Sequence, residues 1–254
     1  IATSTDVGFA GIFDGGGYTI SGITMEYADD DVLTNETGDE DGASNVGLFG
    51  VVSGGTVRNV VLEDAFVKGF QNVGGIVGYM VSGTLHRNSV NRNSASVATV
   101  ADTCEAGDGC IWARYGVYSG GIVGTMSTGT IQYSTVGGSV RGGEEIGGIV
   151  GQMIGGSLLD SSSTAWVDGG GIVGGLAGEA FSGRIERSYS TGNVSGFIEE
   201  GISVEDGSSV GGIIGSLSTV AISDVYASGN VVGTKYVGGL IGVGFPGGIE
   251  IENV

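Results

Sequence analysis

Few residues of this 254-residue chain are suited to chemistry, and most of them lie in three short segments. Cys104 and Cys110 are six residues apart with no histidine nearby, so they lack the ligand set of a zinc site. We expect a disulfide that closes a short loop, which implies an oxidising, extracellular compartment. Free thiols are the alternative.

A group of aromatic and arginine residues continues the same segment. Trp112, Arg114 and Tyr115 follow Cys110 closely, and Tyr118 lies at the exit of the segment. Aromatic rings and arginine are over-represented at binding hot spots, and an aromatic platform also suits the faces of sugars. The sequence therefore predicts a binding loop, with a glycan or a surface protein as partner. The alternative is that Trp112 only packs the loop onto the fold.

Two acidic clusters could hold calcium, which prefers six to eight oxygen ligands. The second cluster is "FIEEGISVEDGSS", and neither cluster matches the EF-hand pattern. Calcium is the one cofactor that the sequence suggests, and a solvated acidic loop is the alternative. The first cluster supplies the candidate ligands Asp29, Asp30, Asp31, Asp39 and Asp41.

The sequence contains few residues in the arrangements that catalysis requires. His86 is the only histidine, and it follows Leu85 in an apolar segment, so we expect it to face outward. Asp160 and Asp224 occupy equivalent positions in non-adjacent coils with Arg187 between them, which indicates decoration of the surface rather than the paired carboxylates of a glycosidase. We predict that the chain is not an enzyme. A polysaccharide-active β-helix enzyme is one alternative.

Charge and composition narrow the partners. Nine Lys and Arg against 28 Asp and Glu give a net charge of −19, which repels nucleic acid. No apolar run is long enough to insert this segment into a membrane. Halophilic adaptation and solubility are both open explanations of the acidity. The triplets that begin at Asn35 and Asn193 are candidate N-glycosylation sites, compatible with export.

The elements that must position these residues come from a repeat. A glycine-bracketed apolar pair recurs seven times, as in "NVGGIVG", and the steps between copies are 28, 46, 27, 23, 41 and 27 residues. The shorter steps fit one solenoid coil, and the two longer steps indicate a coil with an insertion. The glycines are expected at corners and points of close backbone approach. The seven segments span 45–50, 72–78, 119–124, 146–151, 169–174, 210–215 and 237–242.

Each coil divides into three short apolar parts, rich in Val and Ile, which favour strands over helices. The glycine-bracketed segment is the first part, and one residue of the pair Ile149 and Val150 should face inward. The second part begins with an aliphatic residue: Val57, Leu85, Ile131, Leu158, Ile185, Ile222 and Ile251. The third part carries a valine: Val67, Val97, Val140, Val167, Val194 and Val231.

The predicted fold class is therefore all-β, a right-handed parallel β-helix or β-solenoid of about seven coils of three short strands with loop insertions. A single domain over 1–254 is expected. Its lead-in coil with an acidic loop covers 1–44, the repeats cover 45–254, and the insertions lie near 93–116 and 195–208.

The chain resembles the GLUG-motif repeats of bacterial and archaeal surface proteins. The stretches "GTIQYSTVGGSVRG" and "FSGRIERSYSTGNVSG" carry the resemblance, and "FAGIFDGGGYTISGITM" resembles the lead-in of such repeats. GLUG repeats also occur beside an IgA-cleaving metalloprotease domain, but that class needs an H-E-x-x-H zinc helix, which this chain lacks.

The resemblance implies a non-enzymatic extracellular segment of a cell-surface, adhesin-like protein, whose loops contact a glycan or a protein. The alternative is a subunit of an extracellular filament, assembled by end-to-end stacking with copies of itself.

Overall fold

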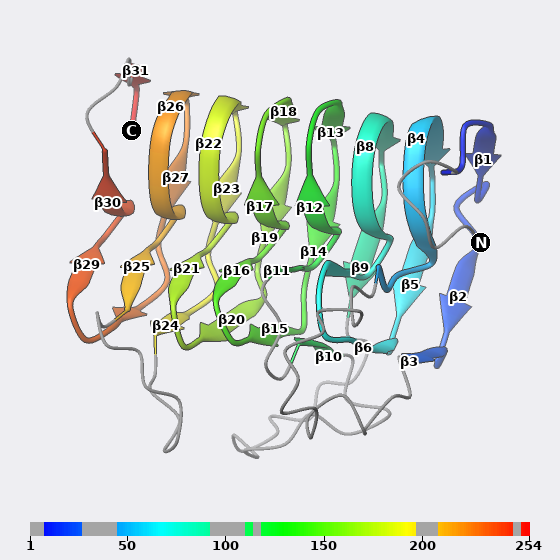
Figure 1. Ribbon diagram of the computed structural model, residues 1–254, viewed down its shortest axis with the longest axis horizontal. Coiled ribbons are helices and arrows are strands. Elements are labelled where there is room, and N and C mark those ends of the chain that lie inside the picture. Colours follow the sequence, from blue (N-terminus) through cyan, green and yellow to red (C-terminus); the bar gives the residue numbers. More distant parts are fainter. Residues whose placement is uncertain (1–7, 27–44, 92–109, 114–117, 197–207, 246–249) are drawn as a thin grey trace, which may run out of the picture.

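The protein is a stack of parallel β-strands that winds around one axis (Figure 1). The computed structural model describes residues 8–26, 45–91, 110–113, 118–196, 208–245 and 250–254. All regular secondary structure in these ranges is β-strand. The described residues therefore include no helix that could cross a membrane. The strands of successive turns pair side by side in four parallel sheets. The predicted all-β parallel solenoid is confirmed, and its handedness stays a prediction.

The largest sheet, sheet A, has 11 strands. They are β1 (Ile12–Asp14), β4 (Phe49–Arg58), β8 (Val77–His86), β12 (Val123–Met126), β13 (Thr130–Gln132), β17 (Val150–Met153), β18 (Ser157–Leu159), β22 (Ala177–Glu186), β26 (Ile214–Ser223), β30 (Ile241–Gly244) and β31 (Glu250–Glu252).

Sheets B and C have seven strands each. Sheet B contains β2 (Thr19–Ser21), β5 (Val61–Glu63), β9 (Ser89–Asn91), β14 (Thr135–Val136), β19 (Ser162–Ser163), β23 (Tyr189–Ser190) and β27 (Tyr226–Ala227). Sheet C contains β3 (Thr24–Glu26), β6 (Phe66–Lys68), β10 (Cys110–Ala113), β15 (Ser139–Gly142), β20 (Trp166–Gly169), β24 (Val194–Gly196) and β28 (Val231–Val232).

Sheet D has six strands. They are β7 (Val73–Gly74), β11 (Tyr118–Gly120), β16 (Glu145–Gly147), β21 (Ile172–Gly174), β25 (Ser209–Gly211) and β29 (Tyr236–Gly238).

Each turn of the chain visits the sheets in the order D, A, B and C, and we call one turn a level. Level 1 holds β1–β3 and level 2 holds β4–β6, with a bridge from Val46 to Val73 in place of a D strand. Levels 3 to 8 begin at β7, β11, β16, β21, β25 and β29. The seven glycine-bracketed segments start levels 2 to 8, and the lead-in forms level 1. The structure divides the first predicted part of each coil into a D strand and an A strand.

The repeated glycines lie where the backbones of sheets D and A approach each other most closely. A Cβ built on the D-strand glycine would be 2.7 Å from the nitrogen of a glycine on the next level's A strand, at every level from 3 to 7. None of these D-strand glycines has a positive φ. Steric exclusion, rather than turn geometry, therefore explains them. They are Gly74, Gly120, Gly147, Gly174 and Gly211.

A different column of glycines provides the bend in the middle of sheet A. Gly83, Gly129, Gly156 and Gly183 have φ values of 122°, 107°, 97° and 107°. These values lie in the region that glycine adopts without the strain imposed by a Cβ. These four glycines lie outside the seven glycine-bracketed segments. For the bracketing glycines the close approach expected from the sequence is therefore confirmed, whereas the left-handed corner belongs to this separate column.

Equivalent aliphatic side chains form columns inside the stack. In sheet A, Val77, Val123 and Val150 are register partners, and all three are fully buried. The second-part column also runs in register, from Val57 to Ile222, with at most 2% exposure. Full burial of such a side chain stabilises the fold by about 1.5–3 kcal/mol.

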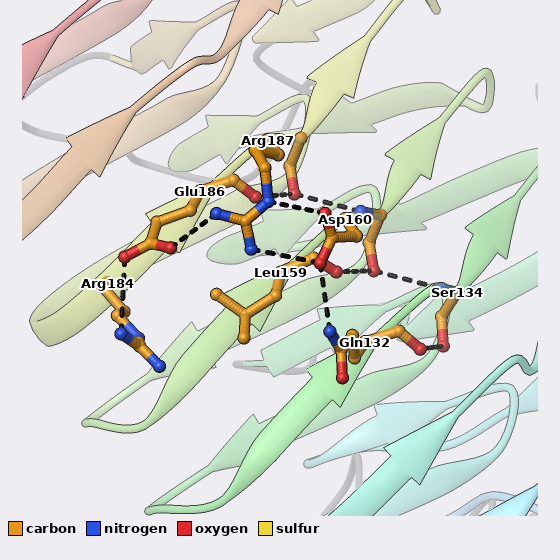
Figure 2. Close-up of polar contacts among 9 residues, drawn as sticks. Gln132, Ser134, Leu159, Asp160, Arg184, Glu186 and Arg187 are labelled. Carbon is orange, nitrogen blue, oxygen red and sulfur yellow. Dashed lines mark hydrogen bonds and ion pairs between the residues drawn. The ribbon is translucent and has the colours of Figure 1, made fainter.

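Buried serines connect levels at the start of the turn into sheet B. The backbone N–H of Ser134 donates to Ser161 Oγ at 3.0 Å, and that of Ser161 donates to Ser188 Oγ at 3.1 Å. Each of these hydroxyls also donates to a carbonyl two residues earlier, as Ser161 Oγ does to Leu159 at 2.7 Å (Figure 2). The small residues noted in the sequence thus satisfy buried polar groups that would otherwise be costly.

Two details of the predicted strands are wrong. Ile111, and not Val97, occupies the sheet C position between Val67 and Val140, because the insertion precedes this strand rather than following it. Val97 itself lies outside the described residues. One residue of the pair Ile149 and Val150 is predicted to face inward, but both are fully buried. The chain bends between sheets D and A at this point, which interrupts the strand alternation.

The close approach of sheets D and A predicts the outcome of a matched pair of glycine substitutions. A Cβ on Gly178 would lie 2.6 Å from the backbone nitrogen of Ile146, whereas one on Gly137 would make its nearest contact at 3.4 Å. Gly178→Ala should lower the free energy of unfolding by about 1–3 kcal/mol or more, as overpacking does. Gly137→Ala should leave it nearly unchanged. Equal effects in thermal and denaturant unfolding would contradict this account of the repeat.

Candidate functional site

The corner between sheets A and B presents one outward residue per level in a left-handed conformation. Asn and Asp adopt this conformation readily, whereas other non-glycine residues pay roughly 1–2 kcal/mol. The column contains Asn59, Arg87, Tyr133, Asp160, Arg187, Asp224 and Asn253, with φ values of 47° to 54°. Adjacent levels are about 4.8 Å apart, so these side chains can interact along the axis.

Asp160 is held by residues of two neighbouring levels (Figure 2). Arg187 donates to both carboxylate oxygens, from Nε to Oδ1 at 2.7 Å and from Nη2 to Oδ2 at 3.1 Å. Gln132 Nε2 donates to Oδ2 at 3.0 Å. The hydrogen bonds from Arg187, followed by that from Gln132, lower the pKa of Asp160. This carboxylate therefore lacks what a general acid needs, a proton retained near neutral pH.

The residues of this column lie on the surface, as the sequence predicts, and the structure adds that several of them are paired. Arg187 also donates from Nη1 to Glu186 at 2.9 Å, and Asp224 accepts a hydrogen bond from Asn253 at 3.0 Å. His86 is half-buried beside fully buried Leu85, and its ring meets the edge of Tyr133 with centroids 5.3 Å apart. The outward position of His86 agrees with the sequence prediction.

Sheet C is the sheet from which the predicted binding loop leaves the solenoid. The backbone of Cys110 pairs with Ser139, and that of Trp112 pairs with Lys68 and Arg141. Cys104, Arg114 and Tyr115 lie outside the described residues. The disulfide and the aromatic platform stay predictions.

A charged contact beside this strand escaped the sequence reasoning. Arg141 Nη2 donates to Asp168 Oδ2 at 2.9 Å, and the two side chains are 12% and 5% exposed. The Arg141 guanidinium also lies 5.6 Å from the ring centroid of Trp166. Arg141 and Asp168 are 27 residues apart, which is one repeat step, so coil alignment was the signal that could have found them. This contact joins β15 to β20, and β15 pairs in turn with β10, the strand that carries Trp112.

Tyr118, the last residue of the predicted binding loop, lies in an acidic cluster. It is the register partner of Glu145, and one Glu145 oxygen is buried without a hydrogen bond from any described residue. Burial, then the nearby charges of Glu144 and Glu179, raises the pKa of Glu145 to about 8. Burial also raises the pKa of Glu179, although Gln152 donates to it at 3.2 Å. Burial and the Glu145 charge raise the pKa of Tyr118.

The remaining predicted site residues are only partly described. The candidate calcium ligands and Asn35 fall in 27–44, outside the described residues. Asn193 is exposed, and its side-chain oxygen accepts a hydrogen bond from the Asn230 N–H at 3.1 Å. Among the described residues, no group of three or more His, Cys, Asp or Glu side chains could hold a metal ion. Calcium binding by the acidic loop therefore stays a prediction.

The raised pKa of Glu145 predicts a pH-dependent stability. Folding favours the protonated carboxyl, so stability should fall as pH rises from the ordinary value of 4.5 toward about 8, and then level off. Glu145→Gln keeps the shape without the charge and should flatten this dependence. The melting temperature from about pH 5 to pH 9 is the measurement. Glu252→Gln, an exposed change in β31, is the control and should resemble the wild type.

A pH dependence that survives the substitution would contradict the role of Glu145. If the melting temperature of Glu145→Gln falls as steeply as that of the wild type across the same pH range, Glu145 is not the group that titrates.

Comparisons with known proteins agree with this architecture. Residues 169–195 match the GLUG motif, and this match spans β21, β22 and β23 and most of β24. A stretch of 107 residues is 35% identical to halomucin from Haloquadratum walsbyi. It covers 42% of this chain and 1% of halomucin, so the chain corresponds to a very small part of that protein.

A solved structure also resembles the chain. It is that of a proposed immunoglobulin A1 protease from Bacteroides ovatus, with 20% identity and a TM-score of 0.45 over 94% of this chain and 61% of that chain. A likeness of this degree carries no argument about activity. The chain is a parallel β-solenoid that carries a GLUG motif, as the resemblance implied.

Proposed function

We propose that this chain is a rigid, non-enzymatic segment of an extracellular cell-surface protein that displays loops for contact with a glycan or a protein. The observation that carries the proposal is where the interruptions attach. Three links between strands are much longer than the two-residue links at equivalent places, such as that from β15 to β16: the link from β3 to the bridge at Val46, the link from β9 to β10, and the link from β24 to β25. Each begins or ends at a strand of sheet C, and specific sites concentrate at such breaks in a repeat.

The comparisons support the surface location. The GLUG match, residues 169–195, lies within the repeated strands of the solenoid, and halomucin is 35% identical to a stretch of 107 residues of the chain. Within the described residues, Asp160 is fully engaged by Arg187 and Gln132, which disfavours the polysaccharide-cleaving alternative.

The display function predicts that binding is lost without unfolding when the insertion is shortened. The deletion must stop before β10, because Ile111 is 1% exposed and belongs to the core. We would replace 94–107 with a short Gly-Ser linker and add Cys110→Ser, so that no unpaired thiol remains. The full-length chain with both Cys104→Ser and Cys110→Ser is the control.

A glycan array and a cell-binding assay would compare the two forms. We expect at least a tenfold loss of binding on deletion, with a similar melting temperature. Unchanged binding by the folded deletion variant would remove the insertion from the proposal.

Calcium binding by the acidic loop is part of the same proposal. Millimolar calcium should raise the melting temperature, whereas sodium chloride of equal ionic strength should not, if carboxylates coordinate the ion. Replacing Asp29, Asp30 and Asp31 together by Asn should abolish the difference. An equal response to both salts would point instead to screening of a chain with a net charge of −19.

The filament is the second candidate function. Levels are joined along the axis by parallel strand pairing in four sheets, and a second copy that stacks end to end would extend the same pairing. Light scattering over a range of concentrations tests this. A mass that stays that of the monomer at high concentration would exclude end-to-end stacking.

A further inference from the structure

Cationic side chains gather on the corner between sheets A and B, although the protein is strongly acidic. The chain has nine Lys and Arg residues against 28 Asp and Glu. Four of the nine flank this corner. Two lie near the end of a sheet A strand and two lie in the left-handed column, and the only histidine, His86, is next to them. They are Arg58, Arg87, Arg184 and Arg187.

These cations divide into two groups with different partners. Arg187 is committed to Asp160 and Glu186, and Arg184 lies 3.5 Å from Glu186. Arg58 uses its Nε for Asp14 at 2.9 Å. Arg87 is exposed, and in the described part of the chain no carboxylate lies within ion-pair distance of it. Its contact is with the Tyr133 ring, whose centroid is 5.9 Å from the guanidinium carbon.

The backbone at Arg87 and Tyr133 is strained for these residue types. Both residues have left-handed φ values, 54° and 53°, where Asn or Asp would cost less. Arg187 adopts the same conformation but gains a two-point contact with Asp160. Arg87 and Tyr133 gain no such ion pair. Strain of this kind concentrates at functional sites, which motivates a search for a ligand at this place.

Tyr133 holds the cationic groups in a fixed arrangement. The Arg87 guanidinium lies over its ring, and the His86 ring meets it edge-on at 86°. Arg58 and His86 are register partners on adjacent strands, about 4.8 Å apart along the axis. A guanidinium presents a planar pair of N–H donors that matches carboxylate and sulfate oxygens. The N–H donors of Arg87 therefore face solvent beside two more nitrogen-bearing side chains.

We propose that the surface formed by Arg58, His86, Arg87 and Tyr133 binds the carboxylate or sulfate groups of an acidic saccharide. Tyr133 is 48% exposed and offers an apolar edge to a sugar ring. Ser89 and Thr135 are neighbouring residues of sheet B, just after the corner, and Thr135 is exposed, so hydroxyl groups adjoin the patch. This site is on the wall of the solenoid, so it goes beyond the proposed function of the insertion.

A saccharide fits this surface better than an acidic protein does. A second copy of this chain also carries a net charge of −19, so long-range repulsion would oppose its docking sideways on this wall. A short acidic saccharide carries a much smaller net charge and supplies hydroxyls to the polar rim. One level of the solenoid is also close to the length of one pyranose unit, so successive sugars could meet successive levels.

The test is binding of defined oligosaccharides to the full chain, measured by calorimetry in moderate and in high salt. The probes are a hexamer of uronic acid, a sulfated hexasaccharide and an uncharged glucose hexamer. We expect the wild type to bind at least one acidic probe, and to bind it tenfold or more tightly than the uncharged one. Arg87→Gln should weaken this binding at least tenfold, while Arg184→Gln, the matched control on the same corner, should change it less than twofold.

A second variant separates folding from binding. Tyr133→Asn suits the left-handed backbone, so it should fold at least as well as the wild type and still lose binding. The variant with the shortened insertion should keep binding, which distinguishes this site from the loop. Absence of binding by the wild type, equal effects of Arg87→Gln and Arg184→Gln, or equally tight binding of a hexaglutamate peptide would each overturn the proposal.

Discussion

The backbones of sheets D and A lie so close together that no Cβ fits between them. A side chain on Gly120 or Gly147 would be 2.7 Å from a backbone nitrogen of the next level. Each glycine therefore fixes the distance between two sheets and also between two levels. That distance brings Val123, Val150 and their equivalents into one buried column. The core of this protein is a consequence of the glycine contacts, because a wider spacing would leave the small aliphatic residues without neighbours.

Much of this arrangement could be predicted from the sequence. Period and apolar spacing were enough to identify the parallel solenoid and the column from Val57 to Ile222, since a repeat constrains every copy alike. The bend between Ile149 and Val150 could not be predicted, because it depends on contact with a different level. The strand at Ile111 was misplaced for a related reason: an insertion breaks the period, and the nearest valine along the chain is no longer the one that pairs with Val67.

The candidate sites were harder to predict than the fold. Coil alignment places Asp160 and Arg187 at the same surface position of the repeat, but their contact was found only in the structure. The burial of Glu145 does not follow from the alignment, because Ile172 and Ser209 are its equivalents on later levels and nothing in the period distinguishes them. The raised pKa of Glu145 follows only when the chain is folded, because burial and the charges of Glu144 and Glu179 cause it.

The solenoid restricts the residue type at most positions of each level, and it restricts the side chain of the corner residue least. Inward residues must match a column, and the glycines must lack a side chain. The corner residue must adopt a left-handed φ, but its side chain points to solvent, so its chemistry can vary without loss of the core. Asn59, Asp224 and Asn253 are types that meet the backbone requirement readily, whereas Arg87 and Tyr133 are strained there without an ion pair. A wall built by repetition thus distinguishes its exceptional residues, and the strain at these two positions is the reason to seek a ligand there.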